Sequence, residues 1–169
     1  MSAPDPTDSA AAWRCLPVTR GCFVCGIDNP AGLGLTLTSD GRTVEVPVRF
    51  RAEHCGFTGV VHGGLLSTVL DEVMAWVIGV NTRSFAFAAE LNVRFARPVA
   101  PGLEMRVRAE LTENRRGRIF LTRGEVVGPE GVVHAEATGK FLPIPAERQA
   151  LMMADFAVDP SPWIGKPAS

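Results

Sequence analysis

Apolar side chains recur at every second position in several stretches of the chain. Between residues 43 and 50, valine and phenylalanine alternate with polar residues, which predicts a strand with one buried face. Pro47 donates no backbone hydrogen bond, so we expect this strand at a sheet edge or a bulge. The same period marks three longer stretches, 85–95, 103–111 and 133–141. The segment 118–127 shows it less cleanly. In 85–95, the odd-numbered residues Phe85 to Phe95 should form one face. Glycine and proline turns separate the runs, so the pattern predicts an antiparallel meander.

One segment has a helical period instead. Its apolar stripe consists of Leu66, Val69, Leu70, Val73, Met74, Trp76 and Val77. Gly63 and Gly64 should open this helix, and Gly79 should close it. A single apolar helix followed by four strands buries every apolar face if a curved sheet wraps around it. The sequence therefore predicts the α+β class and the hotdog fold, a long central helix wrapped by a curved antiparallel β-sheet.

The composition narrows the kind of protein. A length of 169 residues suits one domain. The formal net charge is -1, so no basic excess indicates nucleic-acid binding, and no lysine-rich run indicates a membrane surface. Residues 1–12 lack the basic and apolar segments of a secretory leader, so we expect a cytoplasmic location. We expect a flexible N-terminal tail at 1–20 and an ordered domain at 21–142. The proline-rich tail at 143–169 should hold one short helix near 147–156.

The start of the predicted helix has the features of a reactive site. Backbone N–H groups in a first helical turn lack internal partners, and the helix dipole favours negative charge there. Gly63 and Gly64 carry no side chains, so a ligand can approach this backbone closely. Asp71 lies two turns further on among apolar residues, where a carboxylate costs free energy unless it is paired or used.

His62-Gly63-Gly64, with Asp71 nine residues after the histidine, resembles the motif of hotdog-fold acyl-CoA thioesterases of the phenylacetate-degradation type. Two further stretches, Leu91 to Pro98 and Cys22 to Leu33, are also similar to this family. The resemblance covers about 22–142. It implies that 21–142 is a thioesterase domain that hydrolyses acyl-CoA without a cofactor or metal.

The resemblance also implies roles for individual residues. Asp71 would be the general base or the nucleophile, and the Gly63 amide would receive the oxyanion. His62 would shape the loop rather than transfer protons. The other residues expected to bind substrate are Gly64, Ala88, Glu90 and Arg97. In the family the glycine end and the acid come from different subunits, which implies a homodimer or homotetramer with the active site at the subunit interface.

Two positions depart from the family pattern. Gly56 stands where several relatives have asparagine, and Ala88 stands where several have serine or threonine. Three alternatives follow: a slow enzyme, a water held by another side chain, or a domain that binds acyl-CoA without cleaving it. The candidates for holding water are Thr58, Thr68 and Glu90. A hotdog dehydratase is a further alternative, in which His62 and Asp71 would have to serve as the catalytic pair.

The acidic pair on the helix has a purely structural alternative. Asp71 would then be a buried acid held by backbone amides or an arginine. Glu72 points about 100° away around the helix, so we expect an ion-pair partner or a subunit contact. His134 alternates with buried residues on its strand and is expected to be exposed.

Cys22 and Cys25 form a Cys-x-x-Cys pair. We expect two packed thiols without a metal. The alternative is a zinc site, which would need two more ligands, and His54 and Cys55 could supply them.

Overall fold

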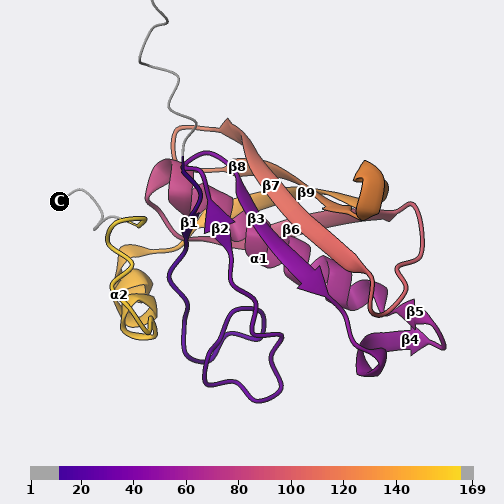
Figure 1. The fold of residues 1–169 in the computed structure, drawn as a ribbon. Helices are drawn as coiled ribbons and strands as arrows, with labels where there is room; N and C mark the ends of the chain where they lie inside the picture. Colours follow the sequence, from indigo (N-terminus) through magenta and orange to yellow (C-terminus); the bar gives the residue numbers. More distant parts are fainter. Residues whose placement is uncertain (1–11, 165–169) are drawn as a thin grey trace, which may run out of the picture.

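The computed structural model describes residues 12–164 of the chain. A long helix, α1 (Gly63–Thr82), lies against a seven-stranded antiparallel sheet (Figure 1). The strands, in sheet order, are β1 (Arg14–Cys15), β2 (Thr38–Ser39), β3 (Val44–Arg49), β7 (Glu104–Asn114), β8 (Phe120–Val127), β9 (Val133–Pro143) and β6 (Ala86–Phe95). The predicted hotdog fold is confirmed.

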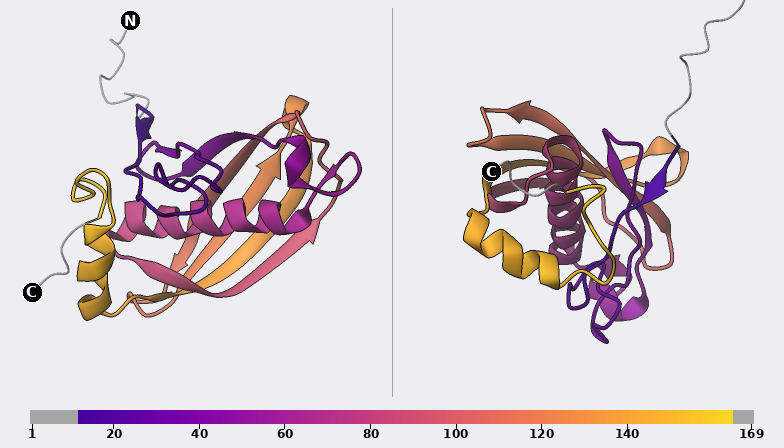
Figure 2. Two further views of the ribbon diagram at one scale, coloured as in Figure 1. Left: turned by 90° about the horizontal axis from the view of Figure 1, so that it is seen from below. Right: turned by 90° about the vertical axis from the view of Figure 1, so that its left-hand side faces the viewer.

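Smaller elements lie at the two ends of α1. A 3-10 turn (Ala52–His54) leads into the hairpin of β4 (Cys55–Phe57) and β5 (Val60–Val61), next to the helix N-terminus. A second helix, α2 (Ala146–Ala154), lies at the opposite end (Figure 2). Another 3-10 turn, Pro129–Gly131, joins β8 to β9.

Two glycines in the sheet let α1 approach closely. A Cβ atom at Gly139 would lie 2.7 Å from Met74 Cε, and one at Gly124 would lie 3.0 Å from Leu70 Cδ2. The helix is long and apolar enough to cross a membrane, but here nine of its residues are buried in the core of the domain. It runs beyond the predicted stop at Gly79 and ends at Arg83, whose φ of 60° closes it in the left-handed conformation.

The face assignment predicted for 85–95 is wrong at Phe87 and Ala89, although Phe85 packs against the core as predicted. Phe87 is 49% exposed and Ala89 is exposed as well, whereas Leu91 and Val93 pack against the core. The pairing of β6 with β9 shifts register between Ala88 and Glu90. The extra residue of this bulge reverses which side chains face the helix, and the alternation of apolar residues does not record it.

His134 is buried, with 9% of its surface exposed, which corrects the expectation of an exposed side chain. The register of β8 and β9 shifts between Val126 and Val127, so the histidine does not follow the simple alternation of its strand. A ring nitrogen lies 2.9 Å from the carbonyl oxygen of Pro98. This contact ties β9 to the segment that follows β6.

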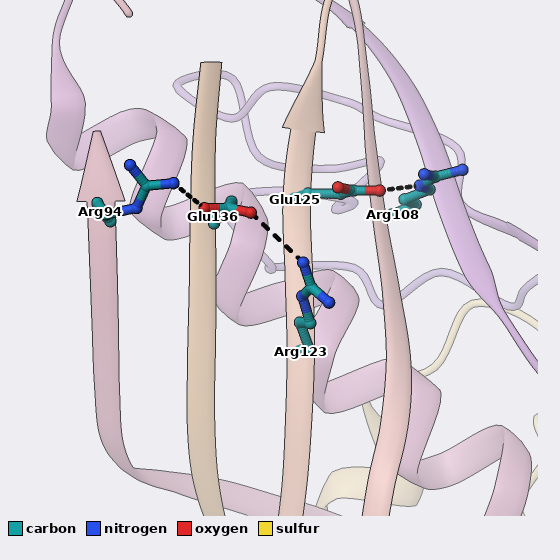
Figure 3. Close-up of polar contacts among 5 residues, drawn as sticks. All are labelled: Arg94, Arg108, Arg123, Glu125 and Glu136. Atoms are coloured by element: carbon teal, nitrogen blue, oxygen red, sulfur yellow. Dashed lines mark hydrogen bonds and ion pairs between the residues drawn. The ribbon is translucent and has the colours of Figure 1, made fainter. Parts of the chain in front are cut away.

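Charged side chains form ion pairs between neighbouring strands on the face of the sheet away from α1 (Figure 3). Glu136 on β9 pairs with Arg94 on β6 and, at 3.4 Å, with Arg123 on β8. Arg108 on β7 pairs with Glu125 on β8. Exposed pairs of this kind contribute little stability individually, but they define the polar face of each strand.

The ordered domain extends past both predicted limits. Within the stretch expected to be an N-terminal tail, β1 pairs with β2, and Leu16 is only 4% exposed. At the other end α2 confirms the predicted short helix, and Ile164 is 1% exposed. A two-residue strand and isolated anchors have no period, so the sequence pattern could not reveal them. The remaining parts of the predicted tails, 1–11 and 165–169, lie outside the described residues.

Candidate active site

His62 is the N-cap of α1. Its backbone is extended, with φ of -62° and ψ of 126°, and its Nδ1 accepts a hydrogen bond of 2.9 Å from the Gly64 N–H. A Cβ atom at Gly64 would lie 2.8 Å from this Nδ1, so the cap needs glycine there. Among the hydrogen bonds of the described residues, none has the Gly63 N–H as donor. Among the described residues, the Gly63 N–H at the helix start is therefore free to receive a ligand atom.

A cavity of about 370 Å³ lies beside this helix start. His62 and Gly63 form one wall, and Phe57, Phe95 and Arg97 contribute to the others. Phe57 is 82% exposed and Phe95 is 52% exposed. The Arg97 guanidinium donates one hydrogen bond of 3.0 Å to the Val133 carbonyl oxygen and is otherwise open to solvent. An apolar mouth with one cation at its rim suits a ligand that has an apolar end and an anionic end.

The Asp71 carboxylate lies in the middle of α1. Its Oδ1 atom is buried and has no hydrogen-bond partner among the described residues. Burial raises the pKa of this carboxyl above its ordinary value. The amide or arginine partners that a structural role would require are not present at this atom. Unsatisfied buried polar groups are uncommon in native proteins, and an acid in this state is a candidate for chemistry.

Gly63 and Asp71 are eight residues apart on one helix. At 1.5 Å per residue, they are separated by about 12 Å along the helix axis. An oxyanion donor and a base that act on the same carbonyl must both lie within about 3 Å of the reacting atoms. A single subunit therefore cannot bring its own Gly63 amide and its own Asp71 within reach of the same carbonyl group.

The remaining predicted residues lie at three places: on α1, in the loop between β4 and β5, and on β6. Thr68 lies on α1, where its hydroxyl donates to the Gly64 carbonyl oxygen at 2.8 Å. Thr58 is exposed in the loop between β4 and β5. Ala88 and Glu90 are exposed on β6, and Glu90 accepts a hydrogen bond of 2.8 Å from Asn92. None of these side chains hydrogen-bonds to the buried Oδ1 atom of Asp71.

Gly56 has a steric explanation. A Cβ atom at this position would lie 2.9 Å from His62 Cδ2. The imidazole ring therefore occupies the space that an asparagine side chain at 56 would need. The position of the His62 ring in this chain therefore requires a residue without a side chain at position 56.

A second cluster of polar side chains lies on another face of α1. Glu72 accepts hydrogen bonds from Cys22 at 3.6 Å, from Cys25 at 3.3 Å and from the Trp76 indole N–H at 3.2 Å. Among the described residues Glu72 forms no salt bridge, so the ion pair considered from the sequence is not found there. The two thiols pack side by side as predicted, but Glu72 completes the cluster.

His54 and Cys55, the two extra ligands considered from the sequence, are not in this cluster. The His54 ring instead lies 3.1 Å from the Arg51 backbone N–H.

Burial and mutual contacts shift the pKa values of all three side chains in this cluster. Burial raises the pKa of Glu72 to about 7. The hydrogen bond between the two thiols lowers the pKa of Cys22 and raises the pKa of Cys25. A Cys-x-x-Cys pair was visible in the sequence, but no spacing rule connects it to a glutamate 47 residues later.

Comparison with known proteins agrees with this architecture. Residues 58–133 match the family described as the Thioesterase superfamily. Over 95 residues the chain is 27% identical to acyl-coenzyme A thioesterase THEM4 of Bos taurus, a match that covers 56% of this chain and 38% of that relative. The chain thus spans well under two thirds of the relative's length.

Solved structures agree as well. One protein of the thioesterase superfamily is 28% identical, with a TM-score of 0.66 over 74% of this chain and 61% of the other. The PaaI protein of E. coli, from its phenylacetic acid degradation operon, is 21% identical, with a TM-score of 0.61 over 67% and 81% of the two chains. The resemblance predicted from the motif is confirmed: the chain is similar to the thioesterase superfamily over 58–133 and shares the hotdog fold of these solved structures.

Proposed function

We propose that the protein is an acyl-CoA thioesterase that converts a thioester and water into a free acid and CoA. The observation that carries this proposal is the buried Oδ1 of Asp71, which has no hydrogen-bond partner among the described residues. The similarity to an acyl-CoA thioesterase supports the substrate class.

Asp71 supplies the base or the nucleophile. As a base it takes a proton from water while the water oxygen attacks the thioester carbonyl. The carbonyl oxygen then carries negative charge, and the Gly63 N–H at the positive end of the helix dipole stabilises it. When the tetrahedral intermediate collapses, the carbon–sulfur bond breaks, and the proton on Asp71 goes to the departing CoA sulfur. As a nucleophile, the carboxylate attacks the thioester carbonyl, the carbon–sulfur bond breaks to release the CoA thiolate, and water then hydrolyses the resulting anhydride to the free acid and the Asp71 carboxylate.

The site is shared between two subunits of a homodimer. The separation of about 12 Å between Gly63 and Asp71 along one helix supports this. The strand β6 also supports it, because its ten residues form one edge of the sheet and leave a row of backbone groups for a second β6. Pairing of two such edges is a two-fold arrangement, which yields two identical sites per dimer. A homotetramer would repeat the same dimer.

Substrate orientation follows from the cavity beside Gly63. Its apolar lining takes the part of the ligand next to the thioester, and Arg97 at the rim meets a CoA phosphate. Arg94 is less suited to this role because Glu136 already pairs with it.

The second candidate is an acyl-CoA-binding protein without hydrolytic activity. Gly56 and Ala88 favour it, since neither can hold a catalytic water with a side chain. Wild-type protein incubated with short, long and aromatic acyl-CoAs separates the two. We expect release of free thiol with at least one class of substrate. Calorimetric binding of acyl-CoA without any thiol release would support the second candidate.

A further inference from the structure

The cluster of Cys22, Cys25 and Glu72 lies outside the proposed active site. One sulfur or oxygen atom from each side chain lies within 4.8 Å of the others. Cys22 Sγ lies 3.6 Å from Glu72 Oε2, and Cys25 Sγ lies 3.3 Å from Glu72 Oε1. In a tetrahedral zinc site, Zn–S bonds near 2.3 Å and Zn–O bonds near 2.0 Å place sulfur and oxygen about 3.5 Å apart. Both sulfur–oxygen contacts are close to this spacing, and all three ligand atoms lie within 4.8 Å of one another.

The backbone around Cys22 favours a thiolate. Its Sγ accepts N–H groups from Val24 at 3.2 Å and from Cys25 at 3.5 Å. A tight turn produces this geometry, in which the Gly26 N–H bonds to the Cys22 carbonyl oxygen at 2.9 Å. A Cβ atom at Gly26 would lie 2.3 Å from that oxygen, so the turn needs glycine. Two amide donors aimed at one sulfur stabilise negative charge on it.

Glu72 is held in a fixed orientation. The Trp76 indole N–H, one turn along α1, donates to Oε1 at 3.2 Å. Metal-binding carboxylates are commonly fixed by such an outer hydrogen bond. No described lysine or arginine forms an ion pair with Glu72, so three acidic side chains share one site without a compensating cation.

We propose that Cys22, Cys25 and Glu72 bind one Zn²⁺ ion, with a fourth position that opens into the adjoining cavity. That cavity, of about 440 Å³, is bounded by Cys22 and Glu72 on one side and by Phe85, Phe156 and Ile164 on others. Water or a donor atom of a bound molecule completes the tetrahedron. Two thiolates and one carboxylate suit zinc, and binding releases the thiol protons to solvent.

The ion would fasten a long loop to the central helix. Residues 16–37 join β1 to β2 and contain no other helix or strand. Within this loop Val24 and Cys25 are buried against the core. A metal that links Cys22 and Cys25 to Glu72 crosslinks positions about 50 residues apart, and closing such long loops favours the folded state.

Metal content tests the proposal without reference to hydrolysis. The full chain, kept reduced with a phosphine and stripped of metal by a chelator, is titrated with Zn²⁺ in competition with a chromogenic chelator. We expect one zinc per chain. Replacement of zinc with Co²⁺ should produce sulfur-to-cobalt charge-transfer absorption and the visible bands of a tetrahedral ion. These bands report thiolate ligation directly in the wild-type chain, without any variant.

Variants then assign the ligands. We expect zinc binding to fall below one ion per chain in three variants: Cys22→Ser, Cys25→Ser and Glu72→Gln. In each of them, the cobalt-substituted protein should also lose the charge-transfer band or the visible bands of a tetrahedral ion. Trp76→Phe removes only the outer hydrogen bond, so we expect affinity to fall by about 10–100-fold. Cys15→Ser and Cys55→Ser are the matched controls and should bind like wild type.

Three results would overturn the proposal: wild-type protein that binds no zinc and gives no thiolate–cobalt band, equal loss of metal in the Cys15 and Cys55 controls, or full binding by the Cys22 and Cys25 variants. Thermal stability that rises with zinc in wild type but not in Cys22→Ser would support the loop-fastening role.

Discussion

Asp71 and Glu72 are neighbours on α1, yet their carboxylates have opposite surroundings. Glu72 accepts three hydrogen bonds, from two thiols and an indole, whereas the buried Oδ1 of Asp71 has none. Consecutive helical residues point about 100° apart, so one helix can present a satisfied acid on one face and an unsatisfied acid on the next. This contrast supports the proposed reactive role of Asp71 and the proposed anchoring role of Glu72.

The first prediction concerns the oxyanion donor. Gly63→Pro removes the N–H group at the first position of α1, where proline suits a helix. The extended backbone of His62 is compatible with a following proline. We expect kcat to fall by about 10²–10³-fold with the fold retained. Gly63→Ala is the control, because it keeps the N–H and meets Phe95 at the same 3.2 Å. Equal losses in both variants would show that crowding, and not the amide, is responsible.

The shared site can be tested with mixed dimers. Subunits carrying Gly63→Pro are combined with subunits carrying Asp71→Asn through two affinity tags. One of the two sites then has both groups intact, so the mixed dimer should recover about half of the wild-type rate. A dimer of one doubly substituted and one wild-type subunit has no intact shared site and should be inactive. The reverse outcome would mean that each subunit contains its own site.

His62 is predicted to act as a helix cap. His62→Ala removes the acceptor for the Gly64 N–H and should lower the free energy of unfolding by about 1 kcal/mol. His62→Asn keeps a capping oxygen, so stability and most of the activity should return. Chemical denaturation and thiol release measure both. Activity lost in His62→Asn at full stability would instead indicate that the imidazole transfers protons, as a dehydratase-like pair requires.

The close packing of α1 on the sheet yields a stability prediction. Gly139→Ala would place a methyl group 2.7 Å from Met74 and 2.5 Å from Phe141. Overpacking of this kind should cost about 1–3 kcal/mol of unfolding free energy in urea denaturation. Gly21→Ala, where a Cβ meets nothing within 4 Å, should change little. Equal stability of the two variants would contradict the tight contact between β9 and α1.

The sequence predicted the architecture because apolar residues recur regularly wherever only one face of a helix or strand is buried. The seven apolar positions from Leu66 to Val77 fixed the helix, and strict alternation fixed the buried faces of β3, β7 and β9. Bulges were not predictable, since an extra residue next to Ala88 changes the faces of β6 without changing its composition. The same limitation hid the burial of His134.

The candidate site was predictable in part. His62, Gly63 and Asp71 are close in sequence and lie on one helix, so a local motif identifies them. The partners of Cys22 were not predictable, because Glu72 is 50 residues away and reaches it only through the path of the loop. The clash between Gly56 and the His62 ring likewise depends on how β4 approaches the helix start.

The most direct measurement of the central claim is the turnover of Asp71→Asn on the best acyl-CoA of wild type. We expect kcat to fall by about 10²–10⁴-fold. The substitution removes a buried charge, so thermal stability and sedimentation should not decline. Glu110→Gln, an exposed acid on β7, serves as the control and should retain wild-type turnover. A folded Asp71→Asn protein that still releases CoA at the wild-type rate would contradict the proposed mechanism.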